Sequence, residues 1–221
     1  FDELFKNKDL FSLVCIDVAN GFSTLMKEMI DYVKQKSNGE LDVMAGNIAS
    51  VEGYQYLAEC GADAVRFGIG SGSRCITAIQ TGINKPLFST IYECKNIHLE
   101  SYPNVAVIGD GGIRYPSDLV LSIAAGADAI MAGGIFAGCD EASGDIIMTE
   151  RGYAKSYYGM ASFEHQEKYY GNIKDGICAE GISFPVPCSG PIKQTVTNFI
   201  GGLKSAMTYL DAENLSDVRK N

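Results

Sequence analysis

This sequence has only two histidines and no excess of basic residues, and each of these shortages argues against a class of function. Lys and Arg total 18 against 27 Asp and Glu, which gives a formal net charge of −9. Such a chain lacks the basic face that nucleic acid or an anionic membrane surface requires. No apolar run approaches the roughly 20 residues that span a bilayer. We therefore expect no nucleic acid and no membrane among its partners.

The cysteines do not form a metal or disulfide framework. There are seven of them with no C-x-x-C pair, and the only histidines are His98 and His165. A zinc site of the usual Cys/His spacing has almost no ligands here. A disulfide scaffold is not expected at this length without a secretory leader. The composition favours the reducing cytoplasm.

Hydrophobic residues make up 46% of the 221 residues, enough for one large globular core. Nearly continuous apolar runs, typical of buried parallel strands, occupy residues 12–18, 41–46, 64–69, 105–110 and 128–133. Amphipathic helices are predicted between them at 23–35, 51–60 and 117–125. This alternation predicts right-handed βαβ units in an α/β fold.

An internal repeat supports a closed barrel. Residues 59–65 (ECGADAV) recur as residues 124–130 (AAGADAI), and each glycine is placed to end a helix in the left-handed conformation. A common αβ loop would look the same by itself. Five strands do not close a (β/α)₈ barrel, which takes eight strands and about 250 residues. We expect the missing strands upstream; the alternative is an open α/β protein.

The regular rhythm stops after the fifth strand. From Tyr153 onward no further βα unit is predicted, and residues 157–190 are interpreted as a long loop punctuated by glycine. Such a loop in a compact domain is usually functional. A final helix is predicted over residues 191–210, with an apolar face formed by Val196, Phe199, Ile200 and Leu203.

A glycine- and serine-rich segment carries the best candidate nucleophile. Residues 68–77 (GIGSGSRCIT) follow a strand, so in a parallel barrel they lie on the face where catalytic loops gather. The segment can offer backbone N–H groups to a phosphate. Cys75 lies just past it, near an expected helix start, where the helix dipole favours a thiolate. Cys15, inside a strand, and Cys60, at a helix end, are interpreted as structural.

Two further strand ends carry glycine pairs. Asp110 precedes Gly111 and Gly112, and Gly133 and Gly134 end the next strand. A carboxylate in that place can accept hydrogen bonds from ribose hydroxyls, while the glycines allow close backbone approach to a phosphate. Phosphate binding at the last two strand ends recurs in barrels.

Six segments, in order along the chain, resemble the IMP dehydrogenase/GMP reductase family. They are residues 16–21 (IDVANG), 44–47 (MAGN), 68–77 (GIGSGSRCIT), 110–112 (DGG), 158–160 (YGM) and 201–203 (GGL). The resemblance implies a (β/α)₈ TIM barrel. This chain would supply strands four to eight, the flap and the C-terminal helix, as a single partial domain over residues 1–221 with the flap at 153–190.

The resemblance implies that Cys75 attacks C2 of a purine nucleotide to form a covalent thioimidate. A reductase then expels ammonia from GMP, takes hydride from NADPH and releases IMP, using Thr77 and the flap residue Glu180. A dehydrogenase instead passes hydride from IMP to NAD and hydrolyses the adduct with a flap Arg-Tyr pair. The flap from Met160 to Glu180 is short and holds no such pair, which favours the reductase. Residues 112–114 (GIR) are more typical of the dehydrogenase, which stays the alternative.

The family's ligand contacts are expected at matching positions. Asp110 would hold the ribose, and the expected nucleotide contacts as a whole are Ser73, Asp110, Gly111, Gly112, Gly133, Gly134, Gly159, Met160, Ala161 and Gly181. The expected NADPH contacts are Asp17, Val18, Ala19, Ile69, Gly70, Gly176, Ile177, Ser205, Ala206, Met207 and Thr208. The carbonyls that match a monovalent-cation site, for example for K⁺, are those of Gly70, Gly72, Cys75 and Ala78. The resemblance also implies a homotetramer.

Plainer explanations exist for several of these residues. Glu180 can be a solvated loop carboxylate, and Asp17 can cap the helix that follows it. Tyr157 and its neighbour Tyr158 can simply pack the flap. The whole chain can also be a nucleotide-binding relative that has lost catalysis.

Overall fold

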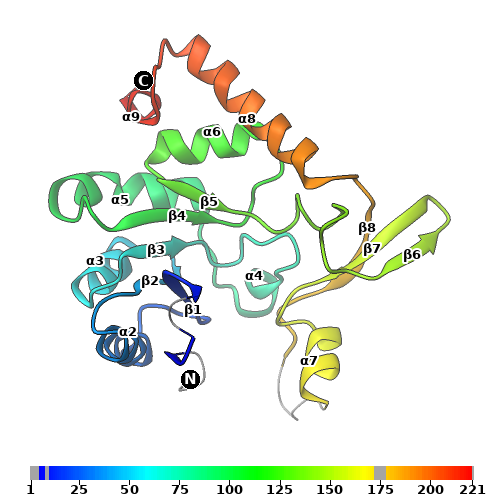
Figure 1. The fold of residues 1–221 in the computed structure, drawn as a ribbon, viewed down its shortest axis with the longest axis horizontal. Helices are drawn as coiled ribbons and strands as arrows, with labels where there is room; N and C mark the ends of the chain where they lie inside the picture. Colours follow the sequence, from blue (N-terminus) through cyan, green and yellow to red (C-terminus); the bar gives the residue numbers. More distant parts are fainter. Residues whose placement is uncertain (1–4, 8–9, 172–177, 221) are drawn as a thin grey trace. The chain divides into compact units, whose positions relative to one another are not determined.

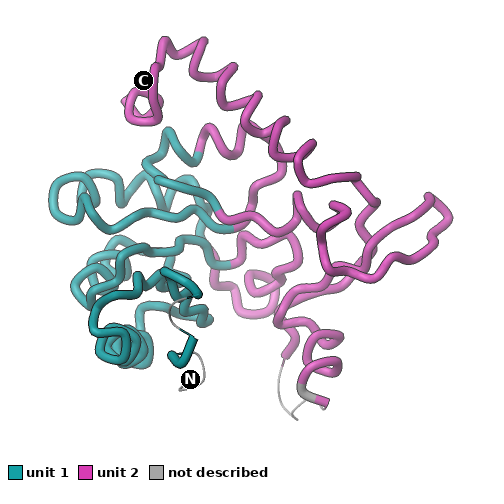
Figure 2. Tube along the Cα trace, in the orientation of Figure 1, with its two compact units in different colours: residues 1–69, 85–110, 122–130 teal, residues 70–84, 111–121, 131–221 magenta. Residues whose placement is uncertain are grey.

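The computed structural model describes residues 5–7, 10–171 and 178–220, and the chain divides into two compact units (Figure 2). The first, here called the sheet unit, comprises residues 1–69, 85–110 and 122–130. The second, the flap unit, comprises residues 70–84, 111–121 and 131–221.

Five short strands form one sheet, in the order in which they follow one another along the chain (Figure 1). They are β1 (Leu13–Asp17), β2 (Asp42–Ile48), β3 (Ala64–Phe67), β4 (Ala106–Asp110) and β5 (Ala129–Met131). Strands β1 to β4 pair in parallel, so their carboxyl ends share one edge of the sheet. All five predicted strands are confirmed, with bounds that differ by at most two residues.

Helices α2 (Thr24–Lys36), α3 (Val51–Glu59) and α5 (Leu87–Ser101) pack against this sheet. Ser23 and Ser50 cap the first two, each accepting a hydrogen bond from a backbone N–H in the first helical turn. These two helices and α6 (Pro116–Ala125) confirm the predicted ones. Helix α5 was not predicted, because its buried face carries the polar residues Thr90 and His98 beside Ile91 and Cys94.

Burial of the strands is uneven. All four residues of β3 are buried, as the continuous apolar run predicted. The same expectation is wrong for β1, where only Ile16 is buried and Cys15 is exposed. The reason is position: β1 is the first strand of the sheet and pairs only with β2 among the strands of the described residues. The interpretation of Cys15 as a buried structural residue fails for the same reason.

The repeated Gly-Ala-Asp segments make the same contact twice. The Asp63 carboxylate accepts a hydrogen bond of 2.6 Å from Val43 N in β2, and the Asp128 carboxylate accepts one of 2.8 Å from Val107 N in β4. Gly61 and Gly126 both have positive φ, as expected where a helix ends. Each repeat therefore joins the end of a helix to the start of the preceding strand, as equivalent βα units would.

The flap unit contains a second, antiparallel sheet, which replaces the long loop predicted over residues 157–190. Its strands β6 (Ile146–Thr149), β7 (Gly152–Tyr158) and β8 (Ser183–Pro187) lie in that order, and α7 (Phe163–Tyr170) follows β7. Strand β8 was missed because Pro185 and Pro187 argue against a strand. Proline is tolerated there because β8 is an edge strand. The predicted end of the βα rhythm is confirmed.

A buried lysine fixes the segment before β6. Lys155, in β7, is 4% exposed, and its ammonium donates hydrogen bonds to the carbonyl oxygens of Cys139 (2.6 Å), Asp140 (3.0 Å) and Ala142 (2.5 Å). Three carbonyl oxygens satisfy all three donors of the ammonium group.

Helix α8 (Ile192–Tyr209) confirms the predicted final helix, and α4 (Thr77–Thr81) and α9 (Leu215–Lys220) are short. Phe199 is the one buried residue of α8, whereas Val196 and Ile200 of the predicted apolar face are exposed. Gly202 lies where an added Cβ would overlap the Pro116 ring, which explains the need for glycine there. No helix in the described ranges is both long and apolar enough to cross a bilayer.

Candidate active site

Three side chains of the flap unit, Cys75, Thr77 and Glu180, form a hydrogen-bonded line, here called the thiol line. The Cys75 thiol donates to Thr77 Oγ1 at 3.1 Å, and Thr77 Oγ1 donates to Glu180 Oε2 at 2.6 Å. Helix α4 begins at Thr77, so Cys75 lies near a helix start as predicted. Glu180 is half-buried and hydrogen-bonded, so it is not a solvated loop carboxylate. A thiol, a hydroxyl and a carboxylate in this order can carry a proton from one end to the other.

Backbone hydrogen bonds hold the three residues in register. Ile76 N donates to Glu180 O at 2.8 Å, and Ile182 N donates to Arg74 O at 3.0 Å. The flap segment around Glu180 is tied in turn to the Tyr-Gly-Met segment, because Glu180 N donates to Ala161 O at 3.1 Å. Residues far apart in sequence are thereby fixed within one small backbone frame.

Two glycines permit this close approach. A Cβ at Gly181 would lie 2.9 Å from Ser162 N, and a Cβ at Gly159 would lie 3.2 Å from Arg74 O. Both were predicted as nucleotide contacts, and both lie beside the cysteine segment. Met160 and Ala161, predicted to flank the base, are exposed next to them. The predicted base contacts and the thiol line therefore belong to one site.

The predicted phosphate residues also cluster in the flap unit. A Cβ at Gly134 would lie 2.8 Å from Ser73 Oγ, and a Cβ at Gly111 would lie 2.6 Å from Ser71 Oγ. Gly111 and Gly112 have φ of 82° and 72°, a conformation that favours glycine. Serine hydroxyls and glycine backbone thus meet within one loop cluster, a combination that can bind a phosphate group.

Tyr157 belongs to this cluster, although the sequence analysis assigned it only to flap packing. A Cβ at Gly133 would lie 2.8 Å from Tyr157 Oη, so the phenol hydroxyl lies directly beside this glycine. Its position in β7, ahead of the Tyr-Gly-Met segment, was the available signal. The Tyr157 hydroxyl adds a hydrogen-bond donor to the cluster of serine hydroxyls and glycine backbone that can bind a phosphate group.

Arg74 is a second residue that the sequence analysis did not single out. Its guanidinium lies 3.1 Å from the centre of the Phe184 ring and 4.6 Å from that of Tyr157. These two rings are directly paired across β7 and β8. Burial lowers the pKa of Arg74, and the neighbouring Tyr157 offsets this only in part. A charged residue inside a loop of small residues was the signal for it.

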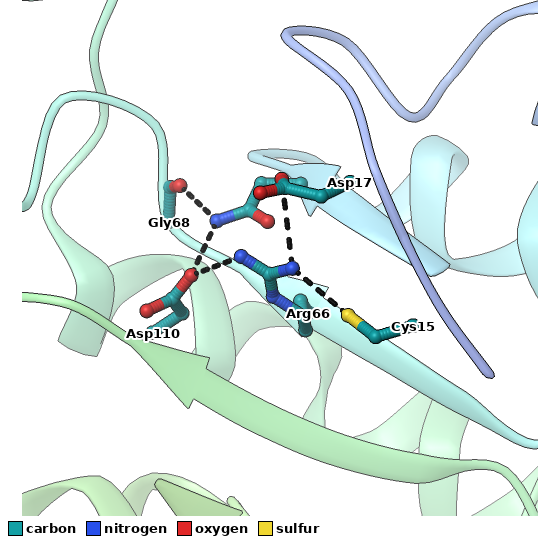
Figure 3. A network of polar contacts seen from close by, with 6 residues as sticks. Cys15, Asp17, Arg66, Gly68 and Asp110 are labelled. Carbon is teal, nitrogen blue, oxygen red and sulfur yellow. Dashed lines mark hydrogen bonds and ion pairs between the residues drawn. The ribbon is translucent and has the colours of Figure 1, made fainter. Parts of the chain in front are cut away.

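In the sheet unit, Asp110 is held by a buried arginine (Figure 3). Asp110 Oδ2 accepts 2.7 Å and 2.9 Å hydrogen bonds from Arg66 Nη2 and Asn47 Nδ2. Arg66 Nη1 lies 3.5 Å from Asp17 Oδ1 and donates to Cys15 Sγ at 3.1 Å. Burial acts to lower the pKa of Arg66, but its hydrogen bond and attraction to Asp110 outweigh this, so the pKa lies above its usual value. Neither Arg66 nor Asn47 was predicted as a site residue.

The predicted cofactor residues fall in both units. Asp17, Val18, Ala19 and Ile69 belong to the sheet unit, and Gly70 and residues 205–208 belong to the flap unit. Gly176 and Ile177 lie outside the described residues. Asp17 does not cap the following helix, because Ser23 does. Its side chain is 54% exposed and available to a ligand.

The predicted cation site consists of backbone carbonyls in the loop around Cys75. Gly72 O accepts a hydrogen bond from Cys75 N, and Ala78 O accepts one from Gly82 N, both at 3.0 Å. Each carbonyl oxygen has a second lone pair for a hard cation. Among the residues that the structure describes, no group of His, Cys, Asp and Glu is arranged to hold a metal ion.

An open pocket of 470 Å³ lies next to the flap segment. Ile76 and Gly181, which flank the thiol line, form part of its wall, together with Gln80, Glu164 and Cys178. The pocket thus adjoins the segments that hold Cys75 and Glu180.

Known proteins of one family are similar to this chain. The family model described as the IMP dehydrogenase/GMP reductase domain matches residues 5–221. Among solved structures, a cysteine-to-alanine variant of GMP reductase from Trypanosoma brucei in complex with guanosine 5′-monophosphate superposes with a TM-score of 0.88 at 32% identity. It covers 95% of this chain and 43% of the other chain.

Curated relatives from both branches are equally similar. Inosine-5′-monophosphate dehydrogenase of Chlorobaculum parvum is 37% identical over 95% of this chain and 44% of the relative. GMP reductase of Onchocerca volvulus is 37% identical over 94% of this chain and 56% of the relative. The chain thus spans about half the length of these relatives.

Parallel strands followed by a loop cysteine and strand-end glycines are typical of a (β/α)₈ barrel, and this chain carries part of such a domain. The chain belongs to the IMP dehydrogenase/GMP reductase family.

Proposed function

We propose that this protein is a GMP reductase, which converts GMP, NADPH and one proton to IMP, ammonia and NADP⁺. The observation that carries the proposal is the hydrogen-bonded line from Cys75 through Thr77 to Glu180. A dehydrogenase must activate water to hydrolyse its thioimidate, whereas a reductase must protonate a leaving amine. A carboxylate reached through a hydroxyl suits the second task.

The first step transfers the thiol proton along this line. Cys75 passes its proton to Thr77, and Thr77 passes its own to Glu180, which leaves a thiolate and a neutral carboxylic acid. The thiolate sulfur then adds to C2 of GMP. The same line runs in reverse when Glu180 returns its proton through Thr77 to the 2-amino group. The C2–N bond breaks, ammonia departs, and C2 remains bonded to sulfur as a thioimidate.

The second step replaces the C2–S bond with a C2–H bond. When bound, NADPH supplies the hydride that C2 requires. The C2–S bond then breaks, its electron pair returns to sulfur, and IMP leaves the site. The thiolate is thereby regenerated, and one proton taken up from water restores the Cys75 thiol for the next turnover.

The remaining contacts orient the nucleotide. The cluster of Ser73, the four strand-end glycines and Tyr157 supplies hydroxyls and backbone amides for the 5′-phosphate. Asp110, oriented by Arg66 and Asn47, would accept hydrogen bonds from the ribose. The close glycines Gly159 and Gly181 let the Tyr-Gly-Met segment pack against the cysteine loop, next to which the planar base would lie.

The chemistry of the predicted cofactor residues fits NADPH. The Asp17 carboxylate and the exposed hydroxyls of Ser205 and Thr208 match the amide and hydroxyl groups of a nicotinamide dinucleotide. We also propose that K⁺ binds the backbone carbonyls around Cys75. We further propose that the protein is a homotetramer and that it acts in the cytoplasm.

IMP dehydrogenase is the second candidate, because dehydrogenases and reductases match this chain at the same 37% identity. One experiment separates the two. The purified full chain is mixed with GMP and NADPH, or with IMP and NAD, and the absorbance of the reduced cofactor is followed. We expect oxidation of NADPH with GMP, and its loss in Cys75→Ala. Reduction of NAD with IMP would identify the dehydrogenase instead, and nucleotide binding without either reaction would identify a non-catalytic relative.

A further inference from the structure

The guanidinium of Arg74 is a buried positive charge without a negative partner in the described part of the chain. The residue is 8% exposed, and its hydrogen-bond partner is a neutral carbonyl, Ser73 O, at 3.2 Å. Its remaining contacts are the faces of the Phe184 and Tyr157 rings. Its Nε atom is buried and makes no hydrogen bond.

In the described part of the chain, the buried residues Arg66 and Lys155 have partners for their charge, although the Nε atom of Arg66 is also without a hydrogen bond. Arg66, 7% exposed, pairs with Asp110 at 2.7 Å and with Asp17 at 3.5 Å. Lys155 has no carboxylate but has three carbonyl oxygens around its ammonium group. A buried charge is normally paired or fully hydrogen-bonded. Arg74 has aromatic faces and one carbonyl, so its charge lacks a counterpart.

The surroundings of Arg74 indicate what that counterpart is. Its neighbour Ser73 places its hydroxyl beside Gly134, and Tyr157, whose ring stacks on the guanidinium, places its hydroxyl beside Gly133. The arginine thus lies one aromatic ring away from a cluster of hydroxyls and glycine backbone. Such a cluster can bind a phosphate group, but its groups are neutral.

We propose that Arg74 supplies the positive charge for the 5′-phosphate of the substrate, and that it makes the site selective for nucleotides over nucleosides. This inference rests on the proposed function. Because the chain carries a net charge of −9, a phosphate dianion approaches it against overall repulsion, and a local buried cation offsets that repulsion. Burial lowers the pKa of Arg74, so the guanidinium gains more from an anion here than it would at the surface.

The test compares two ligands that differ only in the phosphate. Binding of GMP and of guanosine to the purified full chain is measured by calorimetry for the wild type, Arg74→Met and Arg74→Lys. Methionine keeps an unbranched side chain against the two rings and removes the charge, and lysine keeps the charge without the planar group. Arg151→Met removes an exposed arginine from the turn between β6 and β7 and controls for the change in net charge.

We expect Arg74→Met to weaken GMP binding about tenfold or more, because the phosphate loses a nearby positive charge in a poorly solvated site. The affinity for guanosine should stay within about twofold of the wild-type value, because guanosine has no phosphate for Arg74 to attract. Arg74→Lys should fall between the wild type and Arg74→Met, and Arg151→Met should change neither ligand. Should Arg74→Met fail to fold, Arg74→Gln carries the same expectation.

Four results would overturn the inference. Equal weakening of GMP and guanosine would make Arg74 a packing residue that joins the cysteine loop to the flap sheet. Wild-type protein that binds inorganic phosphate, yet binds GMP no better than guanosine, would make this a site for free phosphate. If the wild type binds GMP and Arg74→Met has the same ratio of GMP affinity to guanosine affinity, the role of Arg74 would be rejected and the proposed function would stand. A wild type that binds no nucleotide would contradict both the role of Arg74 and the proposed function.

Discussion

Thr77 and Glu180 are 103 residues apart in the chain, yet Thr77 Oγ1 donates a hydrogen bond of 2.6 Å to Glu180 Oε2. The contact depends on the flap segment, which is tied by backbone hydrogen bonds to the cysteine loop on one side and to residues 159–161 on the other. The flap therefore brings the carboxylate to the site, whereas the loop after β3 brings the thiol and the hydroxyl.

The first prediction concerns this pair. Glu180→Gln should lower kcat for NADPH oxidation with GMP by about 10²–10⁴-fold, because the amide can neither take the thiol proton nor return it to the leaving amine. The KM for GMP should change little, since Glu180 makes no predicted contact with ribose or phosphate. Steady-state kinetics with GMP varied at fixed NADPH measure both constants.

Glu167→Gln is the matched control for this experiment. It removes an exposed carboxylate from α7, in the same flap, and should leave kcat unchanged. Thr77→Val should cause a loss similar to that of Glu180→Gln, and the double variant should lose little more, because both residues serve one proton path. Additive losses would show that the two residues act separately.

The second prediction concerns the pair of Arg66 and Asp110. Asp110→Ala leaves the Arg66 guanidinium buried with Cys15 and the more distant carboxylate of Asp17, so the free energy of unfolding should fall by about 3–5 kcal/mol. Adding Arg66→Met should recover part of this loss, because no buried charge then remains. Urea unfolding of the single and double variants measures these differences.

An exposed ion pair provides the comparison. Lys27 and Asp31 pair at 2.6 Å on the surface of α2, and both side chains are more than half exposed. Asp31→Ala should cost no more than about 1 kcal/mol. Equal costs for Asp31→Ala and Asp110→Ala would contradict the role assigned to burial.

The sequence indicated the strands through their local pattern, and it indicated the hydrogen-bonded line from Cys75 to Glu180 through the family resemblance. Apolar runs that end in glycine locate the strands, and the resemblance around Cys75 located Thr77 and Glu180 at the positions where the hydrogen bonds are found. The pairing of a buried arginine with a carboxylate, by contrast, depends on how the strands pack against one another. Arg66 lies inside the apolar strand β3, and its carboxylate partner Asp110 is the last residue of β4, so no local sequence pattern indicates the pair.

The flap shows a different limit of sequence reasoning. Glycines and prolines over residues 157–190 are typical of loops, yet β8 forms there as an edge strand, because its partner β7 supplies the hydrogen bonds. The pairing of Tyr157 with Phe184 creates the aromatic surface on which Arg74 lies. A cation on such a surface requires the cross-strand register, which the sequence alone does not provide.

The third prediction concerns alkaline pH. Burial raises the pKa of the Cys94 thiol from its ordinary value of 9.0 to about 12. The unfolded chain therefore loses this proton at lower pH than the folded chain, and the free energy of unfolding should be at its full value below pH 9 and fall between pH 9 and 12. The pKa of Tyr54 is also raised, chiefly by burial and then by Asp128, and it acts in the same direction.

Unfolding by urea across this pH range measures the slope. Cys94→Ala should lower stability at every pH, because it leaves a cavity in the core, but it should also make the decline between pH 9 and 12 shallower. Cys188→Ala, which changes an exposed cysteine, should leave the slope as it is. A slope identical in wild type and Cys94→Ala would show that this thiol does not contribute to it.

The last prediction follows from the internal repeat. Asp63 and Asp128 occupy equivalent places in the two Gly-Ala-Asp segments, and each carboxylate accepts a hydrogen bond from a backbone N–H at the start of a buried strand. Asp63→Ala and Asp128→Ala should each lower the free energy of unfolding by about 1–3 kcal/mol, because Val43 N and Val107 N lose their charged acceptor. Asp42→Ala, at an exposed position next to Val43, should cost less than about 0.5 kcal/mol. Losses confined to one of the two repeats would show that the sequence similarity does not reflect a shared structural role, whereas matched losses in urea unfolding would make the contact a common element of the βα units.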